Sequence, residues 1–269
     1  MALVCSIVLL LVMIGFLVYS YINLKRTQKL QAELFKQKEK ALHSEKKKTS
    51  FINSVCHEVR TPLNAIFGFS ELITEDNSEK KEEYFNFIWE SCDQLTYLLN
   101  DMLEVASLEN LSHPLPKEKV NLSAICEKQM NLLQRKYRKE NISYTTEIQK
   151  DIVFLTHPKY FSILIHTLLN NANKFTQKGE IHLSCQWNDK KKEVHIAVTD
   201  TGCGIPSDQY DYVFERFTKL NPFSQGNGLG LYLCRLIMDQ LNGSLRIDPS
   251  YKQGTRFLIV LPQTEERPE

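Results

Sequence analysis

The arrangement most suited to chemistry is a histidine, His57, followed directly by Glu58. An imidazole is a nucleophile and proton carrier near neutral pH, and an adjacent carboxylate can hold one tautomer or accept its proton. The pair is not the zinc motif H-E-x-x-H, because Thr61 stands where the second histidine would be. Pro62 lacks the N–H that would bond the Glu58 carbonyl, so we expect a locally loosened helix. The alternative is an ordinary surface histidine.

The helix that must position His57 carries one apolar stripe, with members spaced three and four residues apart as on one helix face. These members are Ile52, Val55, Val59, Pro62, Ile66, Phe69 and Ile73. His57 is two residues from both Val55 and Val59, which is about 200° around a helix at about 100° per residue. The sequence therefore predicts an exposed His57 opposite the stripe.

Further polar and glycine residues stand later in the chain. Asn171 and Lys174 are three residues apart in a predicted helix, so they share a face. Asp200 ends a predicted strand. Two groups of glycines follow it: Gly202 and Gly204, then Gly226, Gly228 and Gly230. Glycine-rich backbone at a helix start can present N–H groups to phosphates. Alone, each signal has an ordinary alternative, namely a surface amide, an Asp-Gly turn or a chance G-x-G-x-G.

The run from Phe51 to Asn64 closely resembles the phosphoacceptor box of bacterial membrane-bound sensor histidine kinases, which fixes His-Glu-x-Arg-Thr-Pro in order. The resemblance implies that His57 is the phosphoacceptor, that Glu58 assists it, and that Thr61 positions water for a reverse phosphatase reaction. Four more segments resemble the family's other boxes in the family's order: Leu168–Thr176 (N), Asp200–Pro206 (G1), Phe214–Phe217 (F) and Gly226–Leu231 (G2).

These boxes imply a nucleotide site for ATP and Mg²⁺. Asn171 would ligate Mg²⁺ and Lys174 would reach an ATP phosphate, since a hard cation takes an amide oxygen and a lysine supplies a point charge. Asp200 would accept a hydrogen bond from the adenine amino group. The other residues that the resemblance places at the nucleotide are Gly202, Gly204, Phe214, Phe217, Gly226, Gly228, Leu229 and Gly230. For the two phenylalanines, a role as core aromatics is the alternative.

One residue departs from the family pattern. The family usually has a second asparagine four residues before Asn171, and this chain has Thr167 there. A threonine hydroxyl can orient water but supplies no amide, so Mg²⁺ geometry or turnover is expected to suffer. The segment that would form a lid over the nucleotide, residues 218–225 between Phe217 and Gly226, is short.

The N-terminal segment from Ala2 to Ile22 is almost wholly apolar and uncharged. Roughly 20 such residues match the hydrocarbon thickness of a bilayer. No positive leading region or small-x-small cleavage site marks a signal peptide. We expect a single-pass transmembrane helix over residues 1–23 in the cell (inner) membrane. The basic residues that follow it, Lys25, Arg26 and Lys29, predict a cytoplasmic kinase portion. With no extracellular domain expected, the signal would arrive through this helix or a partner, unless the chain is the end piece of a longer protein.

The remainder is predicted to form two domains after a charged helical linker, residues 24–49, for which a coiled coil and a solvated spacer are both open. Residues 50–112 form an all-α helical hairpin, broken at residues 75–78, that pairs into a dimeric four-helix bundle. Residues 117–264 form an α/β two-layer sandwich with helices on one face of a mixed sheet, which the resemblance makes a Bergerat-type ATP-binding fold. Residues 265–269 are a tail.

Within the sandwich, alternating apolar residues predict strands at Ile181–Trp187 and Val194–Val198. A closing antiparallel pair is expected at Leu245–Ile247 and Phe257–Ile259, and helices near Tyr160–Lys174 and Leu229–Leu241.

The sequence thus predicts ATP-dependent autophosphorylation of His57 and transfer of the phosphoryl group to an Asp of a separate response regulator. No fused receiver domain is expected, and the working form is a homodimer. A net charge of +1 gives no strong field for nucleic acid. Scattered cysteines without a C-x-x-C pair suggest neither a zinc knuckle nor a disulfide framework. The absence of G-x-x-x-x-G-K-[ST] excludes a P-loop enzyme.

Two alternatives belong to other classes. The first is a catalytically weak ATP-binding dimeric scaffold or a phosphatase-biased signalling module, with kinase activity reduced through Thr167. The second is a gyrase-like or chaperone ATPase, which is disfavoured because such proteins lack the hairpin that carries His57.

Overall fold

The structure is a computed structural model that describes residues 2–75, 80–111, 113–221 and 226–263. For some residues of the first helix, including 2–12, it describes the backbone alone. The chain divides into two compact units, Met1–His57 and Glu58–Glu269. The predicted tail, residues 265–269, lies outside the described residues.

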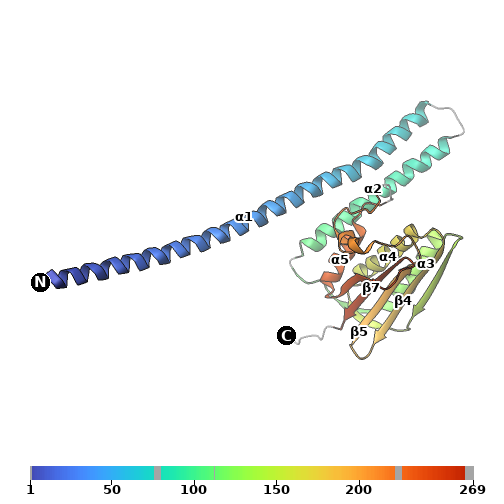
Figure 1. The fold of residues 1–269 in the computed structure, drawn as a ribbon. Helices are drawn as coiled ribbons and strands as arrows, with labels where there is room; N and C mark the ends of the chain where they lie inside the picture. Colours follow the sequence, from blue (N-terminus) through green and yellow to red (C-terminus); the bar gives the residue numbers. More distant parts are fainter. Residues whose placement is uncertain (1, 76–79, 112, 222–225, 264–269) are drawn as a thin grey trace. The chain divides into compact units, whose positions relative to one another are not determined.

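One continuous helix, α1 (Ala2–Glu75), contains the predicted N-terminal helix, the charged linker and the first helix of the hairpin (Figure 1). Pro62 is accommodated inside it. In the described part of the chain, no helix has an apolar stretch of the length needed to cross a membrane. The prediction of a transmembrane helix over residues 1–23 is therefore not supported. The side chains of residues 2–12, on which much of that prediction rests, lie outside the described part of the chain.

The predicted helical hairpin is confirmed by α1 and α2 (Lys81–Glu109). Phe69 of α1 stacks on two rings of α2, those of Phe87 at 4.8 Å and Tyr84 at 5.9 Å between centroids. Along α2, Leu98 and Val105 are buried. The stripe of α1 is buried or half-buried from Val55 onward, but its first member, Ile52, is 58% exposed. The apolar face is thus real but begins one turn later than expected.

The second domain contains a five-stranded mixed sheet in the order β2-β4-β5-β7-β6. Its strands are β2 (Ile142–Ile148), β4 (Gly179–Asn188), β5 (Glu193–Asp200), β6 (Ser244–Ile247) and β7 (Thr255–Pro262). β2 pairs in parallel with β4, and the other pairs are antiparallel, including the predicted closing pair of β6 with β7. The four predicted strands are all present.

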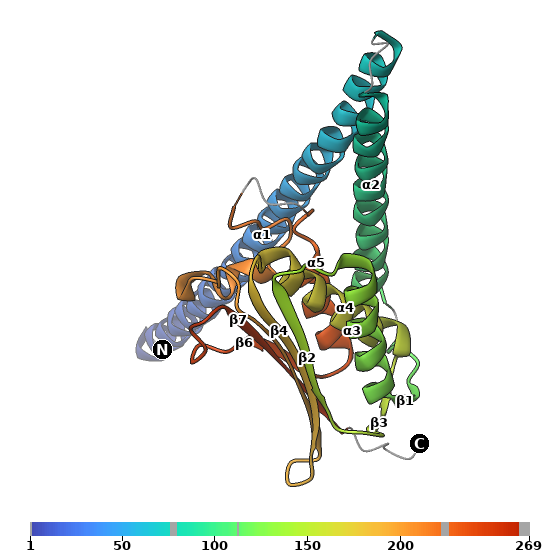
Figure 2. The same ribbon diagram turned by 90° about the vertical axis from the view of Figure 1, so that its right-hand side faces the viewer.

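Three helices cover one face of this sheet (Figure 2): α3 (Leu122–Tyr137), α4 (Pro158–Phe175) and α5 (Gly230–Gln240). Fully buried side chains of α4, such as Phe161 and Leu168, share one core with alternate residues of β4 and β5, such as Leu183 and Ile196. Burial of each such side chain contributes about 1.5–3 kcal/mol, so this core is the main stabilising term for the domain. The two-layer sandwich is confirmed.

The sequence prediction missed four elements: α3 and the strands β1 (Glu118–Asn121), β2 and β3 (Val153–Thr156). β1 and β3 form a separate antiparallel pair. The N-cap of α3 was a readable signal, because the Asn121 side chain accepts a hydrogen bond from the Ala124 N–H at 3.0 Å. Two short 3-10 turns, Ser207–Gln209 and Tyr212–Phe214, follow β5.

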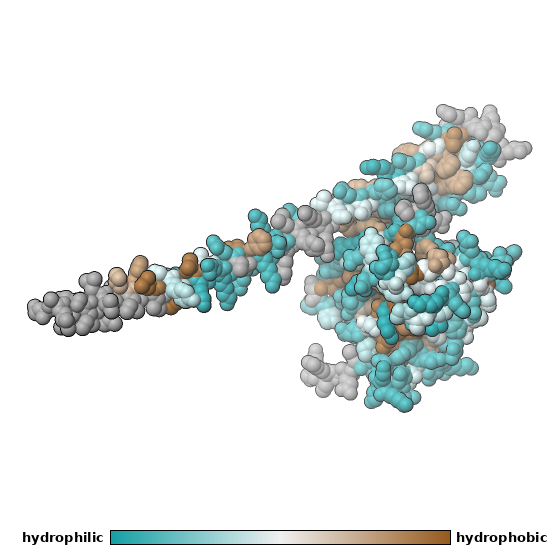
Figure 3. All heavy atoms as spheres, viewed as in Figure 1, coloured by the Kyte–Doolittle hydropathy of each residue, from teal (hydrophilic) through white to brown (hydrophobic). Residues whose placement is uncertain are grey.

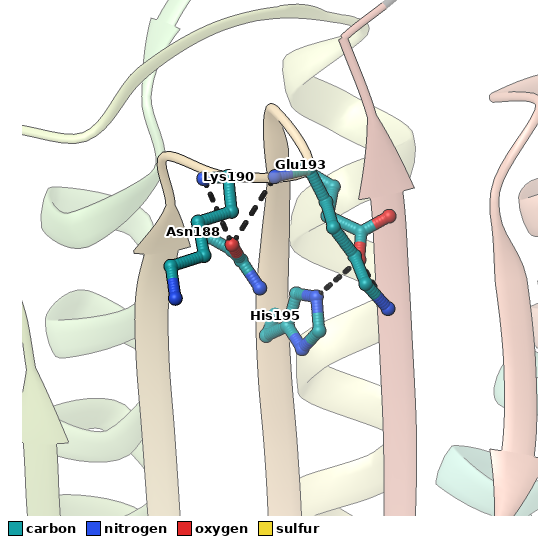
Figure 4. Close-up of polar contacts among 5 residues, drawn as sticks. Asn188, Lys190, Glu193 and His195 are labelled. Carbon is teal, nitrogen blue, oxygen red and sulfur yellow. Dashed lines mark hydrogen bonds and ion pairs between the residues drawn. The ribbon is translucent and has the colours of Figure 1, made fainter.

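The turn between β4 and β5 fixes the register of the central hairpin (Figure 4). Asn188 Oδ1 accepts hydrogen bonds from the N–H groups of Lys190 at 3.1 Å and Lys191 at 3.3 Å. Just past the turn, Glu193 pairs with His195 Nε2 at 2.6 Å. Asn188 therefore pairs with Glu193, and the same register sets Asp200 opposite Ile181 at the far end.

Candidate active site

Asp200 is held at the end of β5 with only 3% of its surface exposed. Its Oδ1 accepts two backbone hydrogen bonds, from Gly202 N–H at 2.8 Å and from Thr255 N–H at 3.3 Å. Burial raises the pKa of the carboxyl, and these backbone hydrogen bonds partly oppose that rise. The site thus contains a fixed, buried hydrogen-bond acceptor, which suits recognition of a polar N–H group.

Glycines pack closely around this carboxyl. A Cβ added to Gly202 would lie 2.5 Å from the carbonyl oxygen of Phe175, and one added to Gly254 would lie 2.2 Å from the carbonyl oxygen of Asp200. Gly204 has a φ of +72°, which glycine adopts most readily. Gly254 was missed in the sequence, although its place just before the last strand was the available signal. Only glycine allows these backbones to meet at Asp200.

Lys174 lies on α4 one turn from Asn171, as the spacing predicts. Its ammonium stands 4.5 Å from the centre of the Phe175 ring, and a Cβ added to Gly226 would be 3.1 Å from Lys174 Nζ. Burial, with a further contribution from the charge of Lys219, lowers the pKa of Lys174 to about 8. The fold thus brings a partly buried cation against the first glycine of the later glycine group.

That glycine group forms a loop before α5. Gly226 and Gly228 have φ angles of +105° and +69°. A Cβ added to Gly228 would lie 2.6 Å from the carbonyl carbon of Phe217. Buried Leu229 is the N-cap residue of α5, and its N–H donates to Asn227 Oδ1 at 2.9 Å. The loop and the helix N-terminus that it precedes are a suitable cradle for phosphate oxygens.

The two F-box phenylalanines occupy different environments. Phe214 is buried and meets Phe257 edge-on, with ring centroids 6.3 Å apart. Phe217 is half-buried and has a φ of +58°, and its backbone lies against Gly228. Phe214 therefore has the position of a core aromatic, while Phe217 supports the glycine loop.

Thr167, the departure from the family pattern, is engaged in helix packing. Its side chain interacts with the Cys234 thiol of α5: burial raises the pKa of that thiol, and this interaction partly opposes the rise. A Cβ added to Gly230 would lie 2.9 Å from Thr167 Cγ2, so the two helices are close here. Thr167 is thus part of the contact between α4 and α5.

Acidic residues of the hairpin contact the nucleotide domain, which the sequence did not predict. Glu58 binds the Lys219 ammonium through both carboxylate oxygens, at 2.8 and 2.7 Å. The contacts made by α2 are Asp101 with Asn227 at 2.7 Å, Glu104 with Lys159 at 2.6 Å, and Glu109 with Arg216 and Tyr232. Burial raises the pKa of Asp101 despite its hydrogen bond to Asn227.

His57 belongs to the first unit and is exposed, as the stripe predicts. Thr61 is exposed as well, whereas Pro62 between the half-buried Val59 and Ile66 is buried. The exposed histidine and the buried proline thus follow the predicted pattern of the two helix faces.

Two domain families match the chain in the order expected from its boxes. Residues 47–111 match the "His Kinase A (phospho-acceptor) domain", and residues 156–265 match the "Histidine kinase-, DNA gyrase B-, and HSP90-like ATPase". Sensor protein SrrB of Staphylococcus aureus (strain MRSA252) is 29% identical over 230 residues, which are 81% of this chain and 38% of SrrB. Hybrid signal transduction histidine kinase A of Dictyostelium discoideum is 30% identical over 256 residues, 88% of this chain and 12% of that protein. The chain spans well under half the length of these relatives.

Solved structures show the same fold. The Acinetobacter baumannii histidine kinase AdeS has a TM-score of 0.65 at 20% identity, over 78% of this chain and 98% of AdeS. Histidine kinase ThkA, solved in complex with response regulator protein TrrA, has a TM-score of 0.64 at 23% identity, over 80% of this chain and 61% of that one. With a phosphoacceptor domain followed by a kinase-type ATPase domain, and with sensor kinases among its relatives, the chain belongs to the sensor histidine kinases.

Proposed function

We propose that this chain transfers the γ-phosphoryl group of ATP to His57. The observation that carries the proposal is the phosphate cradle, in which Lys174 meets Gly226 beside the N-terminus of α5. Asp200 would accept the hydrogen bond of the adenine amino group at the other end of the nucleotide. Such a site contributes mainly by positioning the nucleotide and neutralising its charge.

In the proposed step, a ring nitrogen of His57 attacks the γ-phosphorus in line. The bond from phosphorus to the bridging oxygen breaks, and ADP leaves with that oxygen. The ring proton passes to Glu58, the adjacent carboxylate in the sequence. Thr61, one turn after His57, would position water for the reverse phosphatase reaction.

Mg²⁺ fits the residues present. Mg²⁺ bound with a nucleotide usually takes one or two protein oxygens and completes its shell with phosphates and water. Asn171 lies on α4 one turn before Lys174 and supplies one amide oxygen. Bound Mg²⁺ would neutralise charge on the phosphates, and Asn171 would be its ligand from the protein.

The direct test is incubation of the chain with γ-labelled ATP and Mg²⁺. We expect an acid-labile, base-stable label on the protein that is lost in His57→Gln. The matched control is His113→Gln, because His113 is also an exposed histidine and stands outside the box. Tight ATP binding without label would refute the kinase and favour a scaffold. Repeated ATP turnover without label would indicate a plain ATPase.

We further propose that phosphohistidine donates to an aspartate of a response regulator. The support is the family and the fold shared with ThkA, which was solved with its response regulator. Transfer would be measured as loss of label from the kinase and its appearance on a purified receiver domain.

Pairing of two copies through the hairpin is proposed from its exposed apolar side chains (Figure 3). Trp89, Leu103 and Phe67 are 70%, 68% and 61% exposed. Exposed apolar side chains on a helical pair are most stably buried against another such pair. Analytical ultracentrifugation should show a dimer that Leu103→Lys weakens.

Membrane attachment remains a proposal that rests on the apolar sequence of residues 2–22. Fractionation of cells expressing the full chain, compared with a variant that starts at residue 24, would test it. Recovery of both in the soluble fraction would refute it.

A phosphatase-biased module is the second candidate. It is favoured by Thr167, which stands where the family usually has an asparagine and whose side chain interacts with the Cys234 thiol. A slow kinase reaction with rapid dephosphorylation of a labelled regulator would support this alternative.

A further inference from the structure

A single side-chain amide connects the hairpin to the phosphate cradle. Asn227 stands between Gly226 and Gly228, and both ends of its amide are engaged. Its Nδ2 donates to Asp101 Oδ2 of α2 at 2.7 Å, while its Oδ1 accepts from the Leu229 N–H at 2.9 Å. One residue therefore joins a helix of the phosphoacceptor domain to the first turn of α5.

The loop needs such a restraint because of its composition. Gly226 and Gly228 both have positive φ angles, and glycine gives the unrestrained backbone many alternative conformations. Leu229, the N-cap residue of α5, provides no side-chain cap. The Asn227 amide takes that place, and Asp101 fixes the direction of the amide by accepting its N–H.

The environment of Asp101 makes this contact specific. The side chain is half-buried, and both its burial and the charge of the neighbouring Glu104 raise the pKa of its carboxyl, while the hydrogen bond from Asn227 opposes that rise. Breaking a buried hydrogen bond to a charged group is more costly than breaking a neutral one at the surface. Asn227 is therefore strongly favoured to keep its orientation.

The other contacts of α2 do not reach the loop. Glu104 binds Lys159 at the start of α4, and Glu109 binds Arg216 and Tyr232. The hydrogen bond from Asn227 to Asp101, by contrast, ends between Gly226 and Gly228 of the cradle. Its role can thus be separated from general attachment of the two domains.

We propose that Asp101 is a positioning residue for ATP: acting through Asn227, it holds the Gly226–Gly230 loop in its phosphate-binding shape. The affinity of the cradle for ATP is then set by helix α2 of the phosphoacceptor domain. A movement of α2 that breaks this bond lowers ATP affinity without touching the nucleotide. The inference rests on the proposed ATP-binding function.

The test uses an exchanged pair in the full chain. Asn227→Asp keeps the acceptor for Leu229 N–H but replaces the donor to Asp101 with a second carboxylate. The double variant D101N/N227D restores one donor and one acceptor between the same positions. Binding of a fluorescent ATP analogue should weaken about tenfold in N227D, which corresponds to about 1.4 kcal/mol. The double variant should recover to within about threefold of the unaltered chain.

Lys159→Met is the control, because it removes a contact of α2 that lies away from the loop while Glu104, whose charge acts on Asp101, stays in place. It should change ATP affinity less than about twofold, since Lys159 bonds to Glu104 whereas Asn227 bonds to Asp101. In the kinase assay, N227D should raise KM for ATP while changing kcat little, which a general folding defect would not do. Melting curves would identify any variant that fails to fold, and the recovery in the double variant remains diagnostic in that case.

Unchanged affinity in N227D, additive losses in the double variant, or an equal loss in Lys159→Met would each overturn the inference. Failure of the unaltered chain to bind the analogue would instead overturn the proposed function. The two failures are therefore distinguishable in one experiment.

Discussion

The Lys219 ammonium binds both carboxylate oxygens of Glu58, at 2.8 and 2.7 Å, and its charge also contributes to lowering the pKa of Lys174. Lys219 follows Phe217 by two residues, in the short lid of the nucleotide site. The residue therefore acts on the proposed proton acceptor and on the proposed phosphate ligand together. In this conformation Glu58 is neutralised by a lysine of the nucleotide domain.

Replacing Lys219 by Met removes a like charge near Lys174, so the pKa of Lys174 should rise above about 8. The pH at which ATP affinity begins to fall should move upward in the variant. Binding of the fluorescent analogue from pH 6.5 to 10 would measure the shift. Lys178→Met is the control, because it alters an exposed lysine shortly after Lys174 in the sequence. It should leave the midpoint in place. A midpoint that moves downward would contradict the prediction.

The lowered pKa of Lys174 gives ATP binding a pH dependence of definite sign. With a pKa of about 8 the ammonium is mostly protonated at pH 7 and mostly neutral at pH 9. Only the protonated form attracts phosphate, so affinity should fall above pH 8 by up to about tenfold per pH unit. Lys174→Arg keeps its charge throughout this range and should remove the dependence. An equally steep fall in the arginine variant would assign the titration to another group.

Asp200→Asn should weaken ATP binding while leaving the fold stable. The amide oxygen can still accept from Gly202 and Thr255, whereas the new NH₂ group cannot accept from the adenine amino group. Loss of a hydrogen bond to a charged group, about 1.5–3 kcal/mol, corresponds to roughly 10–150-fold. The melting temperature should stay the same or rise, because burial raises the pKa of this carboxyl and so disfavours its charged form. Asp239→Asn, at an exposed position of α5, is the control.

Thr167→Val preserves shape while removing the hydroxyl that interacts with the Cys234 thiol. We expect a loss of no more than about 1 kcal/mol in the free energy of unfolding, because a thiol is a weak hydrogen-bonding partner. The dependence of autophosphorylation on Mg²⁺ concentration should not change if the hydroxyl serves helix packing. A marked shift in the Mg²⁺ requirement would instead place the hydroxyl at the metal. Denaturant titration and kinase assays at varied Mg²⁺ would separate the two.

Local patterns in the sequence were sufficient for much of the architecture. The apolar stripe predicted an exposed His57, and alternation predicted the four strands from β4 onward. Both signals are periodicities, which depend only on neighbours along the chain. β2 was missed because it is an edge strand and, of its described residues, Ile142 alone is buried, so its apolar alternation is weak. The membrane helix was predicted from apolarity and from its basic flank, and the described part of the chain does not support it.

The sequence by itself determined which residues are available for chemistry, because His57, Asn171, Lys174, Asp200 and the glycines stand in fixed motifs. Tertiary structure decided what surrounds them. The lowered pKa of Lys174 depends on burial and on Lys219, which come from different segments. The hydrogen bond from Asn227 to Asp101 joins residues 126 positions apart. Such contacts depend on how helices pack, and no local pattern records a distance between segments remote in the chain.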